Sequence, residues 1–194
     1  PDSQFPPVVR PWPDVLRELE HLDSLGVREL FIADKTFCYP KSNVVPLLEE
    51  MAGRYRFSWT CHLHPELYEA HLLELMKSAG CHTVITGIES ANMESLSRYG
   101  RKVEKRTVEA LVAHADRIGL SVCADFIIGL EHETEKDIRN TIRYALDLPI
   151  DFASFNIAAP LPGSHIRRTM VRRGRMTFGN EGYDTLAHRG DLGI

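Results

Sequence analysis

Polar side chains that could bind a ligand follow nearly every segment of this sequence with the pattern of a β-strand. The segment 83–88 is apolar and β-branched, which fits a short strand covered on both faces, and Glu89 and Ser90 come directly after it. A carboxylate in this place can accept hydrogen bonds from a hydroxyl or an ammonium group. The other polar groups at strand ends are Asp34, His62, His64, the turn 129–133 and Asn156. Because the carboxyl ends of parallel strands lie at one rim, we predict a ligand site there.

The strands that would carry these residues alternate regularly with helices. Five strand patterns are present, at 28–33, 56–61, 82–88, 120–128 and 151–157. This alternation predicts parallel strands joined by helical crossovers, and therefore an α/β fold. Five strands cannot close an eight-stranded barrel. The first element is a helix whose apolar stripe would normally follow a strand, so the order suggests that an element precedes Pro1.

Several helix ends can be predicted from the sequence. Pro65 is expected to open a helix that continues to Gly80, and Ser90 to cap a short helix. Thr134 and Asp137 have the spacing of a capping box. The helix after this box is expected to turn five side chains inward: Ile138, Thr141, Ile142, Ala145 and Leu146. The basic stretch 101–106 is predicted to be a loop.

Composition narrows the class of protein. The chain has 194 residues, of which 43% are apolar and 26% charged, enough for one domain with a full core. The formal net charge of −4 gives no electrostatic reason to expect nucleic-acid binding. No apolar run approaches the ~20 residues that a membrane-spanning helix needs, and the N-terminal residues resemble neither a signal nor a transit peptide. We therefore expect a cytoplasmic protein that binds neither membranes nor nucleic acid.

The four cysteines are far apart and no pair has Cys-x-x-Cys spacing, so a disulfide scaffold is not expected. Cys61, Cys81 and Cys123 lie in or beside predicted strands, where a thiol packs as a small hydrophobe. Cys38 follows a predicted strand end, and its role is left open.

Five segments share their order and spacing with the strand-end motifs of one enzyme family. They are 31–37, reading Phe-Ile-Ala-Asp-Lys-Thr-Phe; 59–61 with the helix end 75–81; 87–90, reading Gly-Ile-Glu-Ser; 126–130 with Glu133 and Thr134; and 155–157 with the Pro-Leu-Pro-Gly exit at 160–163. From about Arg10 to Gly163 the chain resembles the radical S-adenosylmethionine (radical SAM) enzymes. It is most similar to the branch that is often fused to a cobalamin-binding domain.

The resemblance implies a partial TIM-type (β/α) barrel with parallel strands, truncated here at its N-terminal strand. It also implies a four-iron, four-sulfur cluster, held by a Cys-x-x-x-Cys-x-x-Cys loop, which cleaves SAM to a 5′-deoxyadenosyl radical that attacks a small-molecule substrate. The chain lacks this loop, which would lie upstream of Arg10 together with the first strand. We interpret the chain as part of a larger enzyme, inactive alone, whose other domains are its partners and whose cofactors could include cobalamin.

This interpretation divides the chain into three parts. An extended N-terminal segment covers 1–11, the radical SAM-like core 12–165, and a basic helix with a weakly ordered tail 166–194.

The resemblance also implies which residues bind the cofactor, although each has a structural alternative. Glu89 would lie near the ribose and amino group of SAM, or be a surface charge. Ser90 would line the site, or only cap a helix. Gly129 would let the backbone approach the adenine, or only turn the chain. Asn156 would pair with adenine or a carboxylate, or be a buried amide, and Asp34 would belong to the site or to its loop. No catalytic residue and no metal ligand is assigned.

The sequence departs from the family pattern at three places. Lys35 replaces a second aspartate, His64 a common arginine, and Glu131-His132 a Pro-Gly pair. These changes add charge at the rim.

Two other functions are compatible with the sequence. His62 and His64 alternate after a strand, as in barrel hydrolases that bind a metal, with His132 or His165 to complete a site. The further ligands that such hydrolases need on later strands are not found. The other alternative is a non-catalytic scaffold that binds a partner through an open sheet edge.

Overall fold

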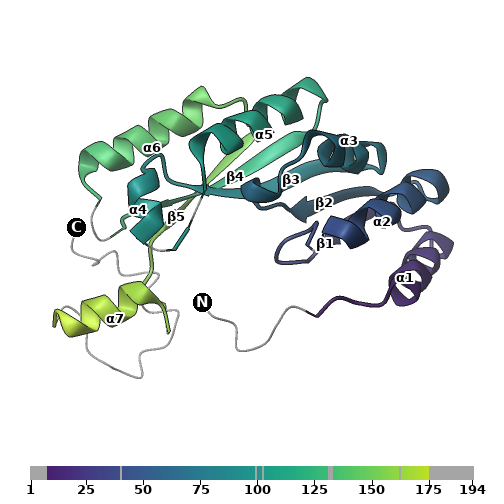
Figure 1. The fold of residues 1–194 in the computed structure, drawn as a ribbon, viewed down its shortest axis with the longest axis horizontal. Coiled ribbons are helices and arrows are strands. Elements are labelled where there is room, and N and C mark those ends of the chain that lie inside the picture. The colour runs from purple at the N-terminus through teal and green to yellow at the C-terminus, as the bar shows by residue number, and fades with distance from the viewer. Residues whose placement is uncertain are drawn as a thin grey trace.

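The computed structural model describes residues 8–39, 41–98, 100–101, 103–130, 133–161 and 163–174. Its centre is a parallel sheet with the strands in sequence order, so each new strand is added beside the previous one. The strands are β1 (Glu29–Ile32), β2 (Ser58–His62), β3 (Cys81–Glu89), β4 (Ser121–Ile128) and β5 (Phe152–Ile157). All five agree with the sequence pattern, and the parallel α/β sheet confirms the predicted fold class (Figure 1).

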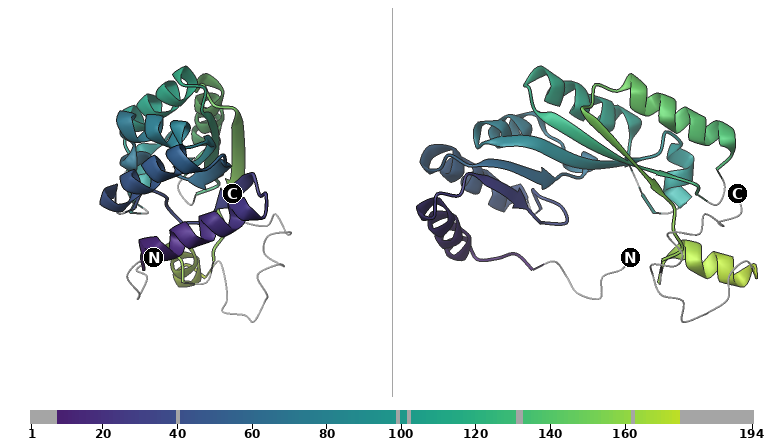
Figure 2. Two further views of the ribbon diagram at one scale, coloured as in Figure 1. Left: turned by 90° about the vertical axis from the view of Figure 1, so that its right-hand side faces the viewer. Right: turned by 180° about the vertical axis from the view of Figure 1, so that it is seen from behind.

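Helices precede the first strand, connect each pair of neighbouring strands and follow the last strand. They are α1 (Trp12–Ser24), α2 (Lys41–Arg54), the short turn η1 (Pro65–Leu67), α3 (Ala70–Ser78), α4 (Met93–Arg98), α5 (Lys105–Arg117), α6 (Glu135–Asp147) and α7 (His165–Arg172). The helices α3, α5 and α6 cover one face of the sheet, whereas α1 lies beyond β1 and α7 lies past the carboxyl end of β5 (Figure 2). Among the described residues, none of these helices combines the length and apolarity needed to cross a bilayer.

The central strands separate a helix-facing side from a more open side. The fully buried side chains alternate along the strands and pack under the helices: Trp59, Cys61, Val84, Ile88, Val122, Ala124 and Phe126. The residues between them face the other way and are half-buried: Thr60, His62, Ile85, Gly87, Cys123 and Asp125. We call this second side of the sheet the inner face. The period of two along each strand places every side chain on one side or the other.

The helix expected from Pro65 is interrupted, because Tyr68 is extended after η1 and α3 begins only at Ala70. The Tyr68 hydroxyl contacts the buried His114 Nδ1 of α5 at 3.0 Å. A continuous helix would point the side chain of Tyr68 in a different direction.

The capping box of Thr134 and Asp137 is confirmed, but the inward face of α6 is not the one expected. Thr141, Tyr144 and Ala145 are buried, whereas Ile142 and Leu146 are 41% and 80% exposed. The ring of Tyr144 packs beneath the Lys105 ammonium of α5, 4.8 Å from its centre, which fixes the rotation of the helix.

Candidate functional site

The strand β3 ends in a distorted backbone that holds Glu89. Its pairing with β4 shifts between Gly87 and Glu89, so Gly87 lies opposite Asp125 and Glu89 opposite Phe126. Glu89 has a φ of 72°, in the left-handed region that a residue with a Cβ rarely adopts. A bulge of this kind re-aims a side chain at the end of a strand. Strain of this type is typical of functional sites and has to be compensated by the surrounding contacts.

The partner of Glu89 is Arg101, which belongs to the basic stretch 101–106 that the sequence predicts to be a loop. The guanidinium Nη2 donates to Glu89 Oε1, and the side chains are 38% and 13% exposed respectively. The Nε of Arg101 is buried and has no hydrogen-bond partner among the described residues. No sequence signal distinguishes Arg101 from its basic neighbours, because only the return of the chain after α4 brings it to the strand end.

Gly87 provides the space for this ion pair. A Cβ at this position would lie 2.7 Å from Glu89 Oε1 and 2.8 Å from Arg101 Nη2. A side chain here would therefore displace both groups, so the pair depends on a glycine two residues before Glu89.

The electrostatics of the site follow from partial burial. Burial raises the pKa of Glu89, Arg101 lowers it, and the negative charge of Asp125 raises it further. At the same rim, burial and the charge of Arg101 lower the pKa of His64, while Glu66 opposes the shift. The backbone N–H of Glu66 donates to His64 Nδ1 at 3.2 Å, so the neutral ring carries its proton on Nε2.

We expect the stability of the chain to depend on the protonation of His64. Because its pKa is lowered in the folded state, its contribution is present above the ordinary value of about 6.5 and is lost as the pH falls. Relative to His64→Asn, which can still accept the Glu66 N–H, the wild type should lose free energy of unfolding between pH 8 and pH 5. The loss should be under about 1 kcal/mol because the ring is half-exposed. Urea unfolding at both pH values measures it, with the exposed His21→Asn as the control. An unchanged difference between wild type and His64→Asn would contradict the assignment.

Ser90 and Glu133 join the ends of β3 and β4. Ser90 Oγ donates to Glu133 Oε1 at 3.3 Å and lies 3.2 Å from Thr141 Oγ1, and Ser90 is 0% exposed. Glu133 Oε2 accepts the N–H of Leu130 at 2.9 Å, which closes the turn after Gly129, whose φ is +79°. Ser90 is not the helix cap that was expected. Asn92 takes that role, because its Oδ1 accepts the N–H of Ser95 at 3.0 Å.

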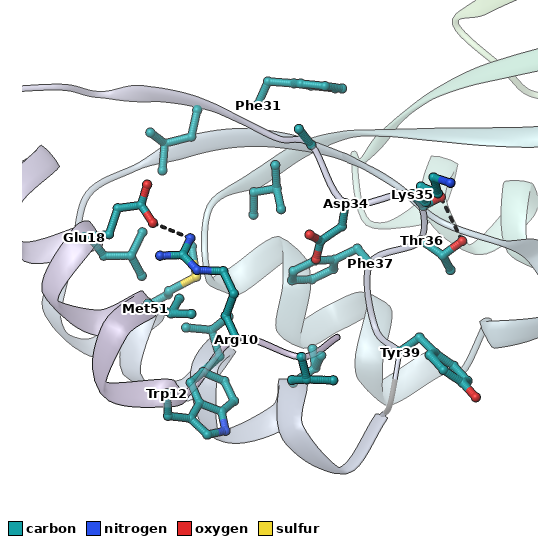
Figure 3. A pocket seen from close by; sticks show the side chains of 18 of the residues that line it. Arg10, Trp12, Glu18, Phe31, Asp34, Lys35, Thr36, Phe37, Tyr39 and Met51 are labelled. Atoms are coloured by element: carbon teal, nitrogen blue, oxygen red, sulfur yellow. Dashed lines mark hydrogen bonds and ion pairs between the residues drawn. The ribbon is translucent and has the colours of Figure 1, made fainter. Parts of the chain in front are cut away.

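The other predicted site residues lie farther from Glu89. Asp34 is exposed after β1 and lines a cavity of about 970 Å³ between α1, β1 and α2. Figure 3 shows its carboxylate turned toward the interior of this cavity, beside Phe37. His64 lines the same cavity, which therefore adjoins the Glu89 site. Asn156 is exposed on β5, and its Nδ2 contacts only Ser154 Oγ, at 3.5 Å, among the described residues.

The histidines and cysteines of the described residues do not gather into a metal site. His62 packs edge-on against Phe31 with ring centres 5.6 Å apart, and His64 Nδ1 is occupied by a backbone N–H. His132 and the side chain of His165 fall outside the described parts of the chain. No group of three or more potential ligands is present in the described residues.

The thiols are equally unsuited to an iron–sulfur cluster. Cys38, Cys61 and Cys81 are buried in the core, and contact with Cys81 together with burial raises the pKa of Cys61. A thiol held in its protonated form is a poor metal ligand. The residues described here therefore do not fit a cluster, whereas Glu89, Arg101 and Gly87 fit a small ligand with a hydroxyl or ammonium group and a carboxylate.

Comparison with known proteins gives the chain a family. Residues 2–145 match the model of the radical SAM superfamily. The chain is 33% identical to the uncharacterized methyltransferase PH0819 of Pyrococcus horikoshii over 157 residues, covering 78% of this chain and 34% of that protein. It is 28% identical to bacteriochlorophyllide d C-12(1)-methyltransferase of Chlorobaculum tepidum over 177 residues, covering 88% of this chain and 38% of that protein. The chain thus spans about a third of the length of these relatives.

Solved structures show the same fold. The radical SAM methyltransferase TsrM from Kitasatospora setae, with cobalamin and a [4Fe-4S] cluster bound, superposes with a TM-score of 0.77 at 19% identity, over 84% of this chain and 32% of that one. Coproporphyrinogen III oxidase from Escherichia coli, a radical SAM enzyme, gives 0.65 at 21% identity, over 91% of this chain and 42% of that one. The resemblance predicted from the five strand-end motifs is confirmed. The chain belongs to the radical SAM superfamily.

Proposed function

We propose that this chain is the SAM-binding core of a radical SAM methyltransferase, and that the cluster ligands lie in another part of the parent enzyme. The observation that carries the proposal is the Glu89–Arg101 ion pair on the bulged end of β3. SAM offers this pair a ribose diol, an ammonium group and a carboxylate. Methyl transfer is supported by the relatives of the chain, several of which are named as methyltransferases.

In this proposal each residue has a defined contact. Glu89 accepts hydrogen bonds from the ribose hydroxyls, and Arg101 binds the carboxylate of the amino-acid end. The turn at Gly129 lets the backbone approach the adenine, whose edge meets Asn156 on β5. Asp34, across the rim, receives the ammonium group. When bound, SAM supplies the precursor of the radical, while these residues orient it.

In this proposal Ser90 positions the residues that contact SAM. It is buried, and its hydroxyl links the strand end that carries Glu89 to Glu133, which closes the turn at Gly129. Ser90 therefore holds the ribose and adenine contacts at a fixed separation.

The buried thiols of the described residues do not fit a cluster, so we propose that the chain has no radical activity alone. The parts 1–11 and 166–194 would flank the core 12–165, and the parent enzyme would add the ligand loop and a cobalamin domain. The small size of this chain relative to its relatives, and the cobalamin in TsrM, support this arrangement.

Calorimetric titration of the purified chain tests the proposal. SAM should bind weakly and adenosine triphosphate should bind at least about tenfold more weakly, because the triphosphate brings like charge to Glu89 and lacks an ammonium group. Equal binding of the two ligands, or no binding of SAM by the folded chain, would contradict the proposed site.

A further inference from the structure

Asp125 is a carboxylate on the inner face that the proposed SAM site does not use. Asp125 lies on β4, with Gly87 of β3 beside it on one side and Ser154 of β5 on the other. Paired residues of neighbouring parallel strands point to the same face of a sheet. Gly87 has no side chain and that of Ser154 is small, but the Glu89–Arg101 pair occupies the space at Gly87. The side of Asp125 toward Ser154 is therefore the one without a large neighbouring side chain.

Asp125 differs from the other acids near it because no donor among the described residues contacts its carboxylate. Within the described ranges, no hydrogen bond or ion pair joins its carboxylate to another residue. By contrast, Glu89 forms an ion pair with Arg101. The carboxylates of Glu133 and Asp151 each accept a backbone N–H, from Leu130 and from Val122 respectively. A half-buried carboxylate without a donor loses hydration and gains nothing in return. Among the described residues, this position is therefore open to a donor from a ligand.

The charge of Asp125 affects two other titratable groups of the site and the inner face. The negative charge of Asp125 raises the pKa of Glu89 at the carboxyl end of β3. Burial, together with the charge of Asp125, also raises the pKa of Cys123, which lies two residues earlier on β4. Since Arg101 already compensates Glu89, Asp125 leaves a net negative charge on this part of the sheet. A cationic group is the complement of that charge.

The surface next to Asp125 is apolar. One step toward the amino ends of the strands, the inner face presents Ile85, Cys123 and Phe152 in register. Phe152 is 65% exposed, so its ring is available to a ligand. A carboxylate next to an exposed aromatic ring and an aliphatic side chain suits a group that is apolar at one end and a hydrogen-bond donor at the other.

We propose that Asp125 determines substrate specificity by accepting a hydrogen bond from a protonated amine of the substrate, whose apolar body lies over Ile85, Cys123 and Phe152. This inference rests on the proposed function, because it places the substrate on the inner face directly below the SAM held by Glu89. It goes further by naming the chemical class of the substrate, an amine with an apolar body.

Two probes with the same ring and opposite charge test the class of substrate. We would titrate 2-phenylethylamine and phenylacetate separately into the full chain and follow amide shifts by NMR. The amine should bind the wild type at least about fivefold more tightly than the acid. Equal binding, or tighter binding of phenylacetate, would overturn the proposal and needs no variant.

The variant Asp125→Asn locates the contact. It should weaken binding of the amine at least about fivefold while leaving SAM binding within about twofold of the wild type. Asp147→Asn, an exposed residue of α6 with the same change in charge, should leave both unchanged. Equal loss with both variants would show a nonspecific charge effect and overturn the role of Asp125.

The two proposals can fail separately. If neither the wild type nor the variants bind SAM but the preference for the amine is retained, the proposed SAM site is wrong and the amine site stands. Normal SAM binding without any binding of the amine would remove only the role of Asp125.

Discussion

Arg101→Ala is expected to weaken SAM binding by about tenfold to a hundredfold, the range expected for losing a charge-assisted hydrogen bond. The same variant should bind 5′-methylthioadenosine as the wild type does, because that ligand has the adenosine of SAM without its carboxylate. Calorimetry with both ligands measures the difference. Arg106→Ala, an exposed arginine a few residues along the chain, is the matched control and should change neither affinity.

Substitutions at Glu89 and Gly87 test how each of these residues contributes to ligand binding. Glu89→Gln should weaken the binding of both SAM and 5′-methylthioadenosine, since both contain the ribose that Glu89 binds. Gly87→Ala should fold, because its Cβ meets only the ends of two side chains, yet it should weaken SAM by displacing the pair. If Glu89→Gln and Arg101→Ala both bind SAM as tightly as the wild type, the ion pair is only structural.

Gly80→Ala is expected to be the most damaging single-methyl substitution in the fold. Gly80 has a φ of +96°, and a Cβ there would lie 2.0 Å from the backbone oxygen of Phe57. The chain cannot yield easily, because the N–H of Trp59 donates to the Gly80 carbonyl at 3.0 Å and the indole N–H of Trp59 to the Ala79 carbonyl at 2.7 Å. Moving Gly80 would therefore disturb the fully buried Trp59 and the pairing of β2 with β3.

The expected loss is more than about 4 kcal/mol in the free energy of unfolding, enough to unfold a marginally stable domain. Gly119→Ala is the matched control. Gly119 also follows a helix and has a φ of +66°, but no atom lies within 4 Å of the added Cβ. It should cost only the backbone term of about 1 kcal/mol. Thermal and urea unfolding of the two variants compares them, and similar losses would show that the short contact relaxes.

Much of the fold could be predicted because local patterns and global topology agree. The β-branched runs, each bounded by glycine or polar residues, predict all five strands. The strand–helix alternation allows only parallel pairing by short connections, so the polar residues at strand ends fall on one rim. Glu89 could be singled out for this reason, since its place depends only on where β3 stops.

Other features depended on residues that are distant in the sequence. Arg101 pairs with Glu89 only because the chain returns after α4, and a single arginine after a glycine has no periodic pattern. Ser90 was expected to cap α4, but its hydroxyl is used by Glu133 and Thr141, more than 40 residues away. The rotation of α6 was also ambiguous, because Thr141 and Ala145 belong to both candidate faces and the packing of Tyr144 under Lys105 selects one.

The sequence by itself determined the strands, their order, the position of Glu89 at the rim and the family. Those follow from hydrophobic period, turn residues and short connections, which act over a few residues at a time. The tertiary structure decided which charges compensate one another. Arg101 pairs with Glu89, whereas Asp125 has no such partner among the described residues, because hydrogen bonding and burial depend on distances in space that spacing along the chain does not encode.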